Sequence, residues 1–391
     1  MTNVKKILFV MPSMETGGIQ TAFRNLIAEL TLCHLFSITV IFLNKNKVKS
    51  GDFPPDIEIM DVGDLPQVIM LSNKQTLKKS IYLFFNRLFA GFFAKYISQK
   101  FAYIFLFRKV KIDRQWDVAV SFAQSSYKSL YGGMNELVIN YIRAEKKIAF
   151  IHCDFNAVHL NNAYSYKIYS KFDKIALVSN GVKKIFDDAI PSLRAKTFVV
   201  YNCHDYSKIR RLAELDPIVY SADRINFISV ARMSKEKGLI RILPIIKRMN
   251  EEGLLFRWHV VGGGNYKYIS RFNKLVKNMQ LESVVLYYGS QDNPYRYMKN
   301  ADILIVPSYH EAAPMVFQEA ECLNLPILTT QTCSAKEFVS DRSIGIVCEN
   351  EESSIYESMR KIILNRNNMV FNFSSQTSNT LAVSQFMDLL K

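Results

Sequence analysis

The chain has few cysteines, and it has no long apolar run. Its six cysteines (33, 153, 203, 322, 333 and 348) are scattered without C-x-x-C spacing, which indicates a reducing compartment and argues against structural zinc. No stretch reaches 18 uncharged apolar residues, so we expect no membrane-spanning helix. The first apolar run, Ile7 to Val10, is too short for a signal peptide and is interpreted as a buried strand. These absences favour a cytoplasmic protein.

Several functional motifs are also missing. No D-x-D metal motif follows a predicted strand, so we expect neither a metal nor another cofactor. The triple glycine at 262–264 is not the G-x-G-x-x-G that follows the first strand of a nicotinamide-binding domain, which argues against a dehydrogenase. No segment resembles a nucleic-acid-binding module. There is no internal repeat and no low-complexity segment.

Positive charge is concentrated in the first half of the chain. Residues 1–200 hold 27 Lys and Arg against 15 Asp and Glu, whereas residues 201–391 hold 23 against 20. The partner of the first half is therefore expected to be anionic, such as a membrane surface or a lipid phosphate. The length of 391 residues and the 49% hydrophobic content predict two globular domains with large cores.

Residues 74–111 differ from the rest of the chain, because they hold nine Lys and Arg, eleven aromatic residues and no acid. Apolar residues recur at helical spacing through Ile81, Phe85, Phe89, Phe92 and Tyr96. The pattern predicts one amphipathic helix with basic flanks. Such a helix can lie in an anionic membrane interface, or its apolar face can pack on the N-terminal sheet. A mixed arrangement, partly buried and partly exposed, is the third possibility.

Short buried strands alternate with helices throughout the chain. In the first half we predict strands at 6–10 (ended by Pro12), 37–43, 116–121, 147–154, 174–179 and 197–202. In the second half we predict strands at 225–231, 256–261, 284–290, 303–306 and 326–330. This alternation is typical of parallel α/β sheets. The predicted domains are 1–203, joined by a C-terminal helical segment at 376–391, and 204–375.

The stretch 302–326 carries the strongest functional signal. A buried strand stops at Pro307, a loop carries Glu311, Pro314 fits the first turn of a helix, and Glu319 lies inside that helix. The first N–H groups of a helix can bind a phosphate. Carboxylates on either side of such a site suit a nucleotide-sugar, which has hydroxyls at both ends and phosphate in the middle. The alternative is an ordinary strand, loop and helix with solvated glutamates.

Two more candidate regions follow predicted strands. Arg232 and Lys237 come after the strand 225–231, and together they can neutralise a diphosphate; the alternative is two solvated cations. Gly17 and Gly18 lie between the first strand and a helix predicted at 19–30. His152 ends the strand that begins at Lys147, at the sheet edge where ligands bind in open α/β folds. A lone histidine can also be structural.

These motifs resemble those of family-four retaining glycosyltransferases with the GT-B fold, the group 1 type. The matching elements are E-x7-E at Glu311 and Glu319, the K-G loop at Lys237, the I-x-H-x-D element at His152 and the early G-G pair. The chain departs from the family at Ala231 and Ala312, where relatives have glycine. The resemblance implies an α/β fold of two Rossmann-like domains that face each other across a cleft, with a C-terminal helix that crosses back to the first domain.

The resemblance also implies site roles. It assigns catalysis to His152, Arg232, Lys237 and Glu311. It assigns donor binding to Gly17, Gly18, Arg232, Lys237, Gly262, Gly264, Gly289, Ser290, Glu311, Ala313, Pro314, Met315, Val316 and Glu319. Glu319 would bind the ribose hydroxyls, Arg232 and Lys237 the diphosphate, and Glu311 the sugar hydroxyls.

The function expected from the resemblance is retaining transfer of a sugar from a nucleoside-diphosphate sugar, more specifically a UDP-sugar. The expected acceptor is a lipid-linked glycan or an oligosaccharide in cell-surface polysaccharide synthesis, used by an enzyme on the inner face of the plasma membrane. Two alternatives stay open. One is a GT-B epimerase or phosphorylase; an epimerase would convert a UDP-sugar without any acceptor. The other is a non-catalytic membrane-associated subunit, which would bind no nucleotide.

Overall fold

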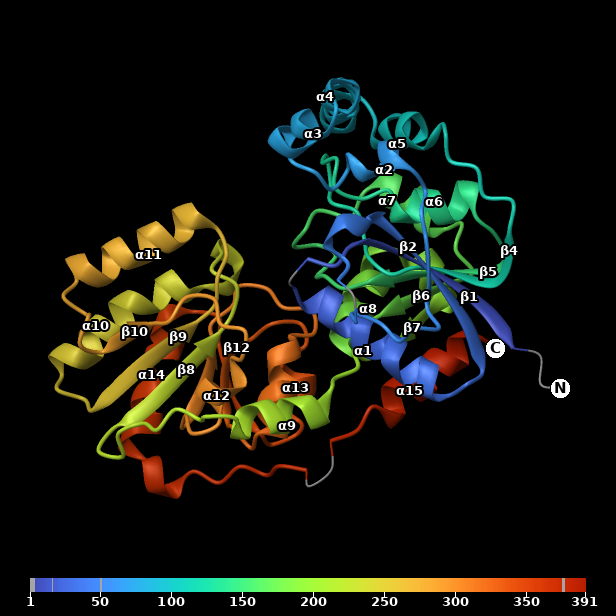
Figure 1. Ribbon diagram of the computed structural model, residues 1–391. Helices are drawn as coiled ribbons and strands as arrows, with labels where there is room; N and C mark the ends of the chain where they lie inside the picture. The colour runs from blue at the N-terminus through green and yellow to red at the C-terminus, as the bar shows by residue number, and fades with distance from the viewer. Residues whose placement is uncertain (1–3, 16, 50, 375–376) are drawn as a thin grey trace. The chain divides into compact units, whose positions relative to one another are not determined.

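The computed structural model describes residues 4–15, 17–49, 51–374 and 377–391. The chain divides into two compact units. Unit 1 comprises Met1–Cys203 and Asn379–Lys391, and unit 2 comprises His204–Ser378. The sequence places the boundaries at 203/204 and at 375/376, and the second of these lies outside the described residues. Figure 1 labels the elements of both units.

Unit 1 is built on a seven-stranded sheet in the order β3-β2-β1-β4-β5-β6-β7, and every recorded pairing in it is parallel. Its strands are β1 (Lys5–Ser13), β2 (Phe36–Asn44), β3 (Glu58–Met60), β4 (Gln115–Ser121), β5 (Arg143–Ile151), β6 (Lys174–Leu177) and β7 (Thr197–Val199). Its main helices are α1 (Gly18–Leu32), α2 (Asp64–Gln67), α3 (Asn73–Lys79), α4 (Ile81–Tyr96), α5 (Gln99–Phe107), α6 (Met134–Tyr141), α7 (Ala163–Tyr169), α8 (Asn180–Ala189) and α15 (Thr380–Leu389).

Unit 2 repeats this plan with a six-stranded parallel sheet in the order β10-β9-β8-β11-β12-β13. Its strands are β8 (Ile225–Val230), β9 (Phe256–Val261), β10 (Val285–Tyr287), β11 (Ile303–Val306), β12 (Ile327–Thr330) and β13 (Gly345–Cys348). Its main helices are α9 (Tyr206–Glu214), α10 (Leu243–Glu251), α11 (Tyr266–Asn278), α12 (Tyr295–Met298), α13 (Met315–Cys322) and α14 (Glu352–Leu364). Short helical turns η3 (Lys235–Lys237) and η4 (Leu239–Ile242) follow β8.

The strand order of both sheets is that of the doubly wound Rossmann fold, so the expected α/β class with two Rossmann-like domains is confirmed. The order reverses between β1 and β4 in unit 1 and between β8 and β11 in unit 2. Open α/β sheets bind ligands beyond the carboxyl ends of the strands at such a reversal. The loops after β8 and β11 are therefore the first place to look for a site in unit 2.

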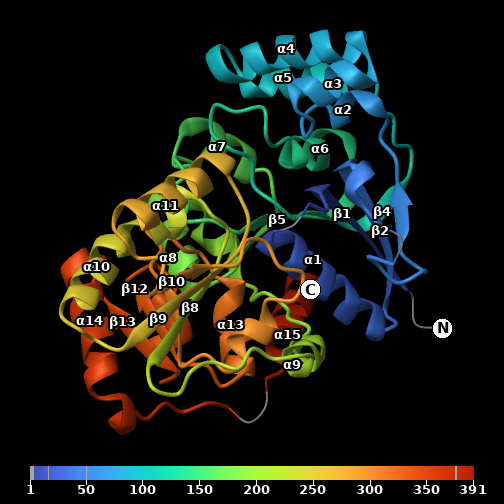
Figure 2. The same cartoon turned by 60° about the vertical axis from the view of Figure 1, so that its left-hand side comes forward.

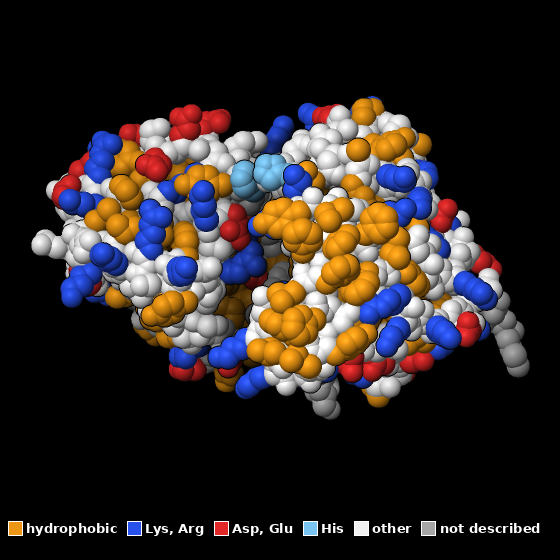
Figure 3. Space-filling model, turned by 90° about the horizontal axis from the view of Figure 1, so that it is seen from above, with side chains coloured by type: hydrophobic (Ala, Val, Ile, Leu, Met, Phe, Trp, Pro, Cys, Tyr) orange, Lys and Arg blue, Asp and Glu red, His pale blue; other side chains and the backbone are white. Residues whose placement is uncertain are grey.

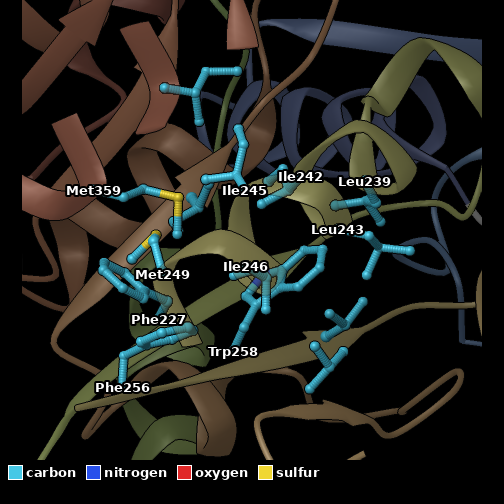
Figure 4. Close-up of a cluster of buried hydrophobic side chains, with 14 of the residues drawn as sticks. Phe227, Leu239, Ile242, Leu243, Ile245, Ile246, Met249, Phe256, Trp258 and Met359 are labelled. Carbon is cyan, nitrogen blue, oxygen red and sulfur yellow. The ribbon is translucent and has the colours of Figure 1, made fainter. Parts of the chain in front are cut away.

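The core of unit 2 fixes the position of these loops. Phe227 of β8 and Trp258 of β9 are fully buried against residues of η4 and α10, as Figure 4 shows. The Trp258 indole N–H donates to Ser229 Oγ at 3.0 Å, so the buried ring also satisfies its polar group. The strand and the turns that follow it are thus held by both packing and hydrogen bonding.

The first strand is longer than predicted. Pro12 lies inside β1 rather than ending it. The pairing of β1 with β4 ends at Val10, and the pairing with β2 includes Met11 and Ser13 but not Pro12. The missing N–H of the proline therefore breaks no ladder hydrogen bond, and the strand continues through it.

The amphipathic helix predicted from the apolar pattern that begins at Ile81 is confirmed as α4, and the basic segments on either side of it form two further helices, α3 and α5. Ser80 and Ser98 have extended backbones and occupy the N-cap positions of α4 and α5, without a side-chain capping hydrogen bond. Figures 1 and 2 show these helices together at one end of unit 1. The buried side of α4 carries only Leu83, Asn86, Ala90 and Ala94, so most of its aromatic residues are left outside the core.

The C-terminal helix belongs to unit 1, as expected. Phe386 of α15 stacks on Phe9 of β1 with ring centroids 6.0 Å apart, and Lys5 Nζ donates to the Leu390 carbonyl at 3.0 Å. The side chain of Gln385 accepts from the Tyr201 N–H at 3.0 Å. The chain therefore returns from unit 2 to complete the core of unit 1.

Gly238 ends the turn η3 and permits the loops after β8 and β11 to meet. Its φ is +69°, and a Cβ built there would lie 2.0 Å from the Pro307 carbonyl oxygen. Both the left-handed backbone and the close approach require glycine. Gly253 has nearly the same φ, +73°, but open space around it.

We predict that Gly238→Ala destabilises unit 2 far more than Gly253→Ala. The second change costs only the left-handed backbone penalty of about 1–2 kcal/mol, whereas the first adds a backbone clash. The measurement is denaturant unfolding followed by Trp258 fluorescence in a Trp116→Phe background, since the chain has two tryptophans and this leaves only the one in unit 2. Equal losses of unfolding free energy for the two variants would contradict the close approach of Gly238 to Pro307.

Candidate functional site

Lys237 and Glu311 form an ion pair at the strand-order reversal of unit 2. Lys237 Nζ lies 2.6 Å from Glu311 Oε1, and Ser308 Oγ donates to the same oxygen at 2.6 Å. The side chain of Glu311 is 8% exposed and that of Lys237 is 24% exposed. A buried carboxylate is tolerated when it is paired and hydrogen-bonded, and both conditions hold here. Two residues 74 positions apart thus meet where a ligand is expected.

The loop that carries Glu311 is tied down from three sides. The Tyr309 N–H donates to the Glu236 carbonyl at 2.9 Å, which links the loop after β11 to η3. Thr330 Oγ1 donates to the Ser308 carbonyl at 2.6 Å, and the Cys333 thiol donates to the Glu311 carbonyl at 2.9 Å. The carboxylate is therefore held by a rigid loop, which favours a positioning role.

Arg232 is engaged with a neighbour that the sequence did not single out. Its guanidinium lies 2.7 Å from Glu236 Oε1, which also accepts from Ser234 Oγ at 2.6 Å. Burial raises the pKa of Glu236, but hydrogen bonds from Ser234 and Arg232 outweigh it, so this pKa is lowered and the carboxyl stays ionised. A bound anion would compete with Glu236 for Arg232. The Arg232 side chain is 67% exposed, so solvent and an anion can reach it.

The predicted donor-side glycines lie together after β9 and β10. The Gly262 N–H donates to the Gly289 carbonyl at 2.8 Å, and a Cβ on Gly263 would lie 3.0 Å from Ser290 Cβ. A Cβ on Gly262 would meet the Ala231 carbonyl oxygen at 1.9 Å. Gly264 is similarly close to Met233, with a Cβ 2.7 Å from its carbonyl oxygen. The approach of the loop after β8 therefore requires Gly262 and Gly264, whereas Gly289 has open space and is favoured only by its φ of +70°.

Helix α13 begins one residue later than predicted. Pro314 is the N-cap with extended backbone, and Met315 and Val316 open the helix. No side chain caps this end of the helix, so its N-terminal N–H groups suit an anion. The residues before it, Ala312 and Ala313, are not among the described residues with left-handed backbone. The loop therefore does not use the conformation that would demand glycine.

Glu319 projects from α13 and pairs with Tyr295, whose hydroxyl donates to Glu319 Oε1 at 3.2 Å. Burial raises the pKa of Glu319 to about 7, although the hydrogen bond from Tyr295 opposes the shift. Burial and the nearby carboxyl also raise the pKa of Tyr295. Glu319 therefore changes its protonation state near neutral pH, and a ligand that donates hydroxyls to it would favour the ionised form.

In unit 1, His152 follows β5 at the carboxyl end of the sheet. Its ring stacks on Phe150 and lies against Phe122, with centroids 5.7 and 4.8 Å apart. Burial lowers the pKa of His152 to about 3, so the ring is neutral at physiological pH. Its Nε2 atom is buried and has no hydrogen-bond partner. A neutral ring with one unsatisfied nitrogen is prepared to bond a ligand hydroxyl.

The early glycine pair is less informative. Gly18 is the first residue of α1, and Gly17 is its N-cap with φ 173°, an extended conformation open to any residue. A Cβ on Gly17 would meet only the movable end of the Gln20 side chain. Close approach to a ligand stays a prediction for these two residues.

No cluster of three or more His, Cys, Asp or Glu among the described residues could hold a metal ion. None of the helices they form combines the length and the apolar character needed to cross a bilayer.

The solved structures that match this chain define its class. The Anabaena protein Alr3699/HepE, solved in complex with UDP, aligns with a TM-score of 0.64 and 14% identity, covering 98% of this chain and 94% of that one. TarM aligns with a TM-score of 0.68 and 11% identity, covering 99% of each chain. At these identities the likeness shows the fold alone, and that fold is GT-B, with two parallel-sheet α/β domains.

The second unit matches a family model. Residues 217–378 match the family model described as glycosyl transferases group 1, so the expected resemblance to group 1 glycosyltransferases is confirmed. The matched segment contains the loops after β8 and β11, with Lys237, Glu311 and Glu319.

Curated relatives agree with this assignment. A Campylobacter jejuni enzyme named N-acetylgalactosamine-N,N'-diacetylbacillosaminyl-diphospho-undecaprenol 4-alpha-N-acetylgalactosaminyltransferase is 25% identical over 236 residues, which is 60% of this chain and 62% of the relative. The lipopolysaccharide glucosyltransferase WaaG of Escherichia coli is 30% identical over 134 residues, 34% of each chain. A glycosyltransferase of Methanocaldococcus jannaschii is 27% identical over 172 residues, 42% of each chain. The chain thus covers less than two thirds of the length of these relatives.

The sequence did not single out three residues near the candidate site: Tyr295, Glu236 and Cys333. Ser308 lies three residues before Glu311, in the S-x-x-E spacing that forms part of the resemblance. Tyr295 and Cys333 reach the site from other loops, 24 residues from Glu319 and 22 from Glu311. Only the folded sheet brings them there.

The raised pKa of Glu319 predicts a pH-dependent stability of unit 2. The unfolded chain releases this proton near pH 4.5 and the folded chain near pH 7. Between these values the unfolded state binds fewer protons, so the free energy of unfolding falls as pH rises, by at most about 3 kcal/mol. Glu319→Gln should remove this dependence. Trp258-monitored unfolding of both proteins at either end of the pH range tests it, and identical pH profiles would refute it.

Proposed function

We propose that this protein is a retaining glycosyltransferase that moves a sugar from a UDP-sugar to a lipid-linked or oligosaccharide acceptor in cell-surface polysaccharide synthesis. The observation that carries the proposal is the Lys237–Glu311 pair at the strand-order reversal of unit 2. It is supported by the group 1 match of the same unit. The Anabaena structure solved with UDP-glucose supports a UDP-sugar donor, and the Campylobacter relative's name supports a lipid-diphosphate-linked acceptor.

In this proposal each charged side chain has one task. Lys237 and Arg232 bind the diphosphate together with the N–H groups at the start of α13, and they stabilise the charge that develops on it as it leaves. These cations take the role that a metal would have. Glu319 accepts from the ribose hydroxyls, and Glu311, held by Lys237 and Ser308, accepts from the hydroxyls of the sugar. Gly262, Gly264, Gly289 and Ser290 line the nucleotide side.

The reaction would occur on one face of the sugar. The bond from the anomeric carbon to the diphosphate oxygen breaks, the acceptor hydroxyl oxygen forms the new bond on the same face, and its proton passes to the departing diphosphate. The neutral His152 hydrogen-bonds a sugar hydroxyl through Nε2. No side chain is needed as a covalent nucleophile.

Replacement of Lys237 by alanine should lower turnover by about 10²–10³-fold, the usual cost of removing one group that stabilises transition-state charge. Lys235→Ala is the matched control, because Lys235 lies in the same turn and is exposed. A thermal-shift panel of UDP-, GDP- and ADP-sugars first identifies the donor, and release of the nucleoside diphosphate from that donor measures turnover. A folded Lys237→Ala protein with normal turnover would refute the catalytic assignment, and no thermal shift with any donor would favour the non-catalytic alternative.

We also propose that α3–α5 bind an anionic membrane surface. Their exposed large apolar residues are Leu77, Ile81, Tyr82, Phe85, Leu88, Phe89, Phe92, Tyr96, Ile97, Phe101 and Ile104. Figure 3 shows hydrophobic side chains gathered on this face, with Lys and Arg beside them. Aromatic residues that insert between lipids and cations that meet the headgroups account for both features. The protein would then act as a peripheral protein on the inner face of the plasma membrane.

Exchange of Phe85 and Phe92 for serine should weaken vesicle binding by about tenfold or more, because both aromatic rings lose their burial in lipid. Both side chains are more than half exposed, so the fold should tolerate the change. Tyr166→Ser on α7, also at an exposed aromatic residue, is the control. Co-sedimentation with phosphatidylcholine vesicles, with and without phosphatidylglycerol, measures binding. Equal binding by the double variant and the control would contradict the proposal.

A further inference from the structure

A small polar cavity in unit 1 has no role in the proposed chemistry. It measures about 10 Å³, enough for one water molecule or one hydroxyl group. With its open mouth, the hollow encloses about 290 Å³. It is lined by residues of the loop after β4, of α5, α6 and α7, including Ser126, Tyr127, Asn135, Glu136 and Tyr164.

The floor of the cavity is an acidic side chain with one unused oxygen. Glu136 on α6 is 3% exposed. Its Oε1 atom accepts from the Tyr164 hydroxyl, whereas Oε2 is buried without a hydrogen-bond partner. Burial raises the pKa of Glu136, which favours the uncharged carboxyl. A buried polar oxygen without a partner costs free energy. A hydrogen-bond donor that enters from outside and bonds Oε2 would remove this cost.

The mouth of the hollow is aromatic. Tyr127 is 41% exposed, and Lys128 Nζ lies over its ring, 5.3 Å from the centroid, so an arriving ligand would use the opposite face. An aromatic face beside uncharged polar groups fits a sugar ring, which has apolar C–H faces and hydroxyl edges. An uncharged carboxyl repels an anionic ligand less than a carboxylate would. It also carries no positive charge that would attract an anion.

The position of the hollow matches a ligand site. It opens beyond the carboxyl end of β4, which borders the strand-order reversal of unit 1. The same loop contacts the segment that carries His152, because Gln124 Oε1 accepts from the His152 N–H at 3.1 Å. A sugar held here would lie within unit 1 on the ligand edge of its sheet.

We propose that this hollow is a carbohydrate subsite: one sugar hydroxyl enters the cavity and bonds Glu136 Oε2, while the ring lies against Tyr127. The ligand class is an uncharged pyranoside. The statement that this pyranoside is part of the acceptor rests on the proposed function. The binding of a sugar in the hollow does not. Tyr164 is a positioning residue, because its hydroxyl donates to the Glu136 carboxyl.

The test uses the full chain and methyl glycosides of glucose, galactose, N-acetylglucosamine and N-acetylgalactosamine, with binding followed by saturation-transfer NMR. We expect at least one glycoside to bind, and we expect Tyr127→Ala and Glu136→Leu each to weaken it by about tenfold. Tyr166→Ala, which removes an exposed tyrosine of α7 outside the hollow, should change the affinity less than about twofold. Glu136→Leu alters a buried site. If that variant does not fold, Tyr127→Ala alone tests the inference.

Binding of no glycoside would overturn the inference and leave the cavity as a structural water site only. Equal binding by Tyr127→Ala and Tyr166→Ala would also overturn it. UDP-induced thermal stabilisation of the same variants keeps the two proposals apart. If UDP stabilises the protein but glycosides do not bind, the subsite fails alone; if glycosides bind but no nucleotide does, the proposed donor chemistry fails alone.

Discussion

The account depends on one interaction, the ion pair between Lys237 and Glu311. A carboxylate as buried as that of Glu311 is stable only beside a fixed partner. The pair forms because the strand order of unit 2 reverses between β8 and β11, which brings the loops after these strands together. Gly238 allows the contact, since any side chain there would collide with Pro307. The chemistry proposed for this site therefore begins with a packing requirement.

The remaining candidate groups differ in how ready they are for a ligand. His152 and Glu136 each keep one buried polar atom without a partner, and Glu319 has a pKa near neutrality because of burial. Arg232, by contrast, is satisfied by Glu236 and must exchange that partner for an anion. Unsatisfied or shifted groups of this kind cluster at functional sites. In each of the two units, such groups lie at the carboxyl end of the sheet.

Much of the fold could be predicted from the sequence, because buried strands and glycine turns are local signals. The pairing of Lys237 with Glu311 was also within reach, since each follows a strand that could be recognised. Tyr295 and the cavity at Glu136 were not, because their partners come from distant segments. Glu236 was not singled out either, although its partner Arg232 lies only four residues away. Within 74–111 the apolar periodicity predicted α4, but the separate helices α3 and α5 were not predicted; the extended backbones of Ser80 and Ser98 divide the segment into three helices. The prediction that Pro12 ends the first strand was wrong. Whether its missing N–H breaks a ladder hydrogen bond depends on its neighbours in the sheet.

The most direct test of the central claim is a crystal structure of this chain with UDP. The account predicts that the diphosphate lies within hydrogen-bonding distance, about 3 Å, of Lys237 Nζ, at the N-terminus of α13. It also predicts that the ribose hydroxyls meet the Glu319 carboxyl and that Arg232 has left Glu236 for the phosphate. UDP bound elsewhere, or bound with the Lys237–Glu311 pair facing away from the phosphates, would contradict it.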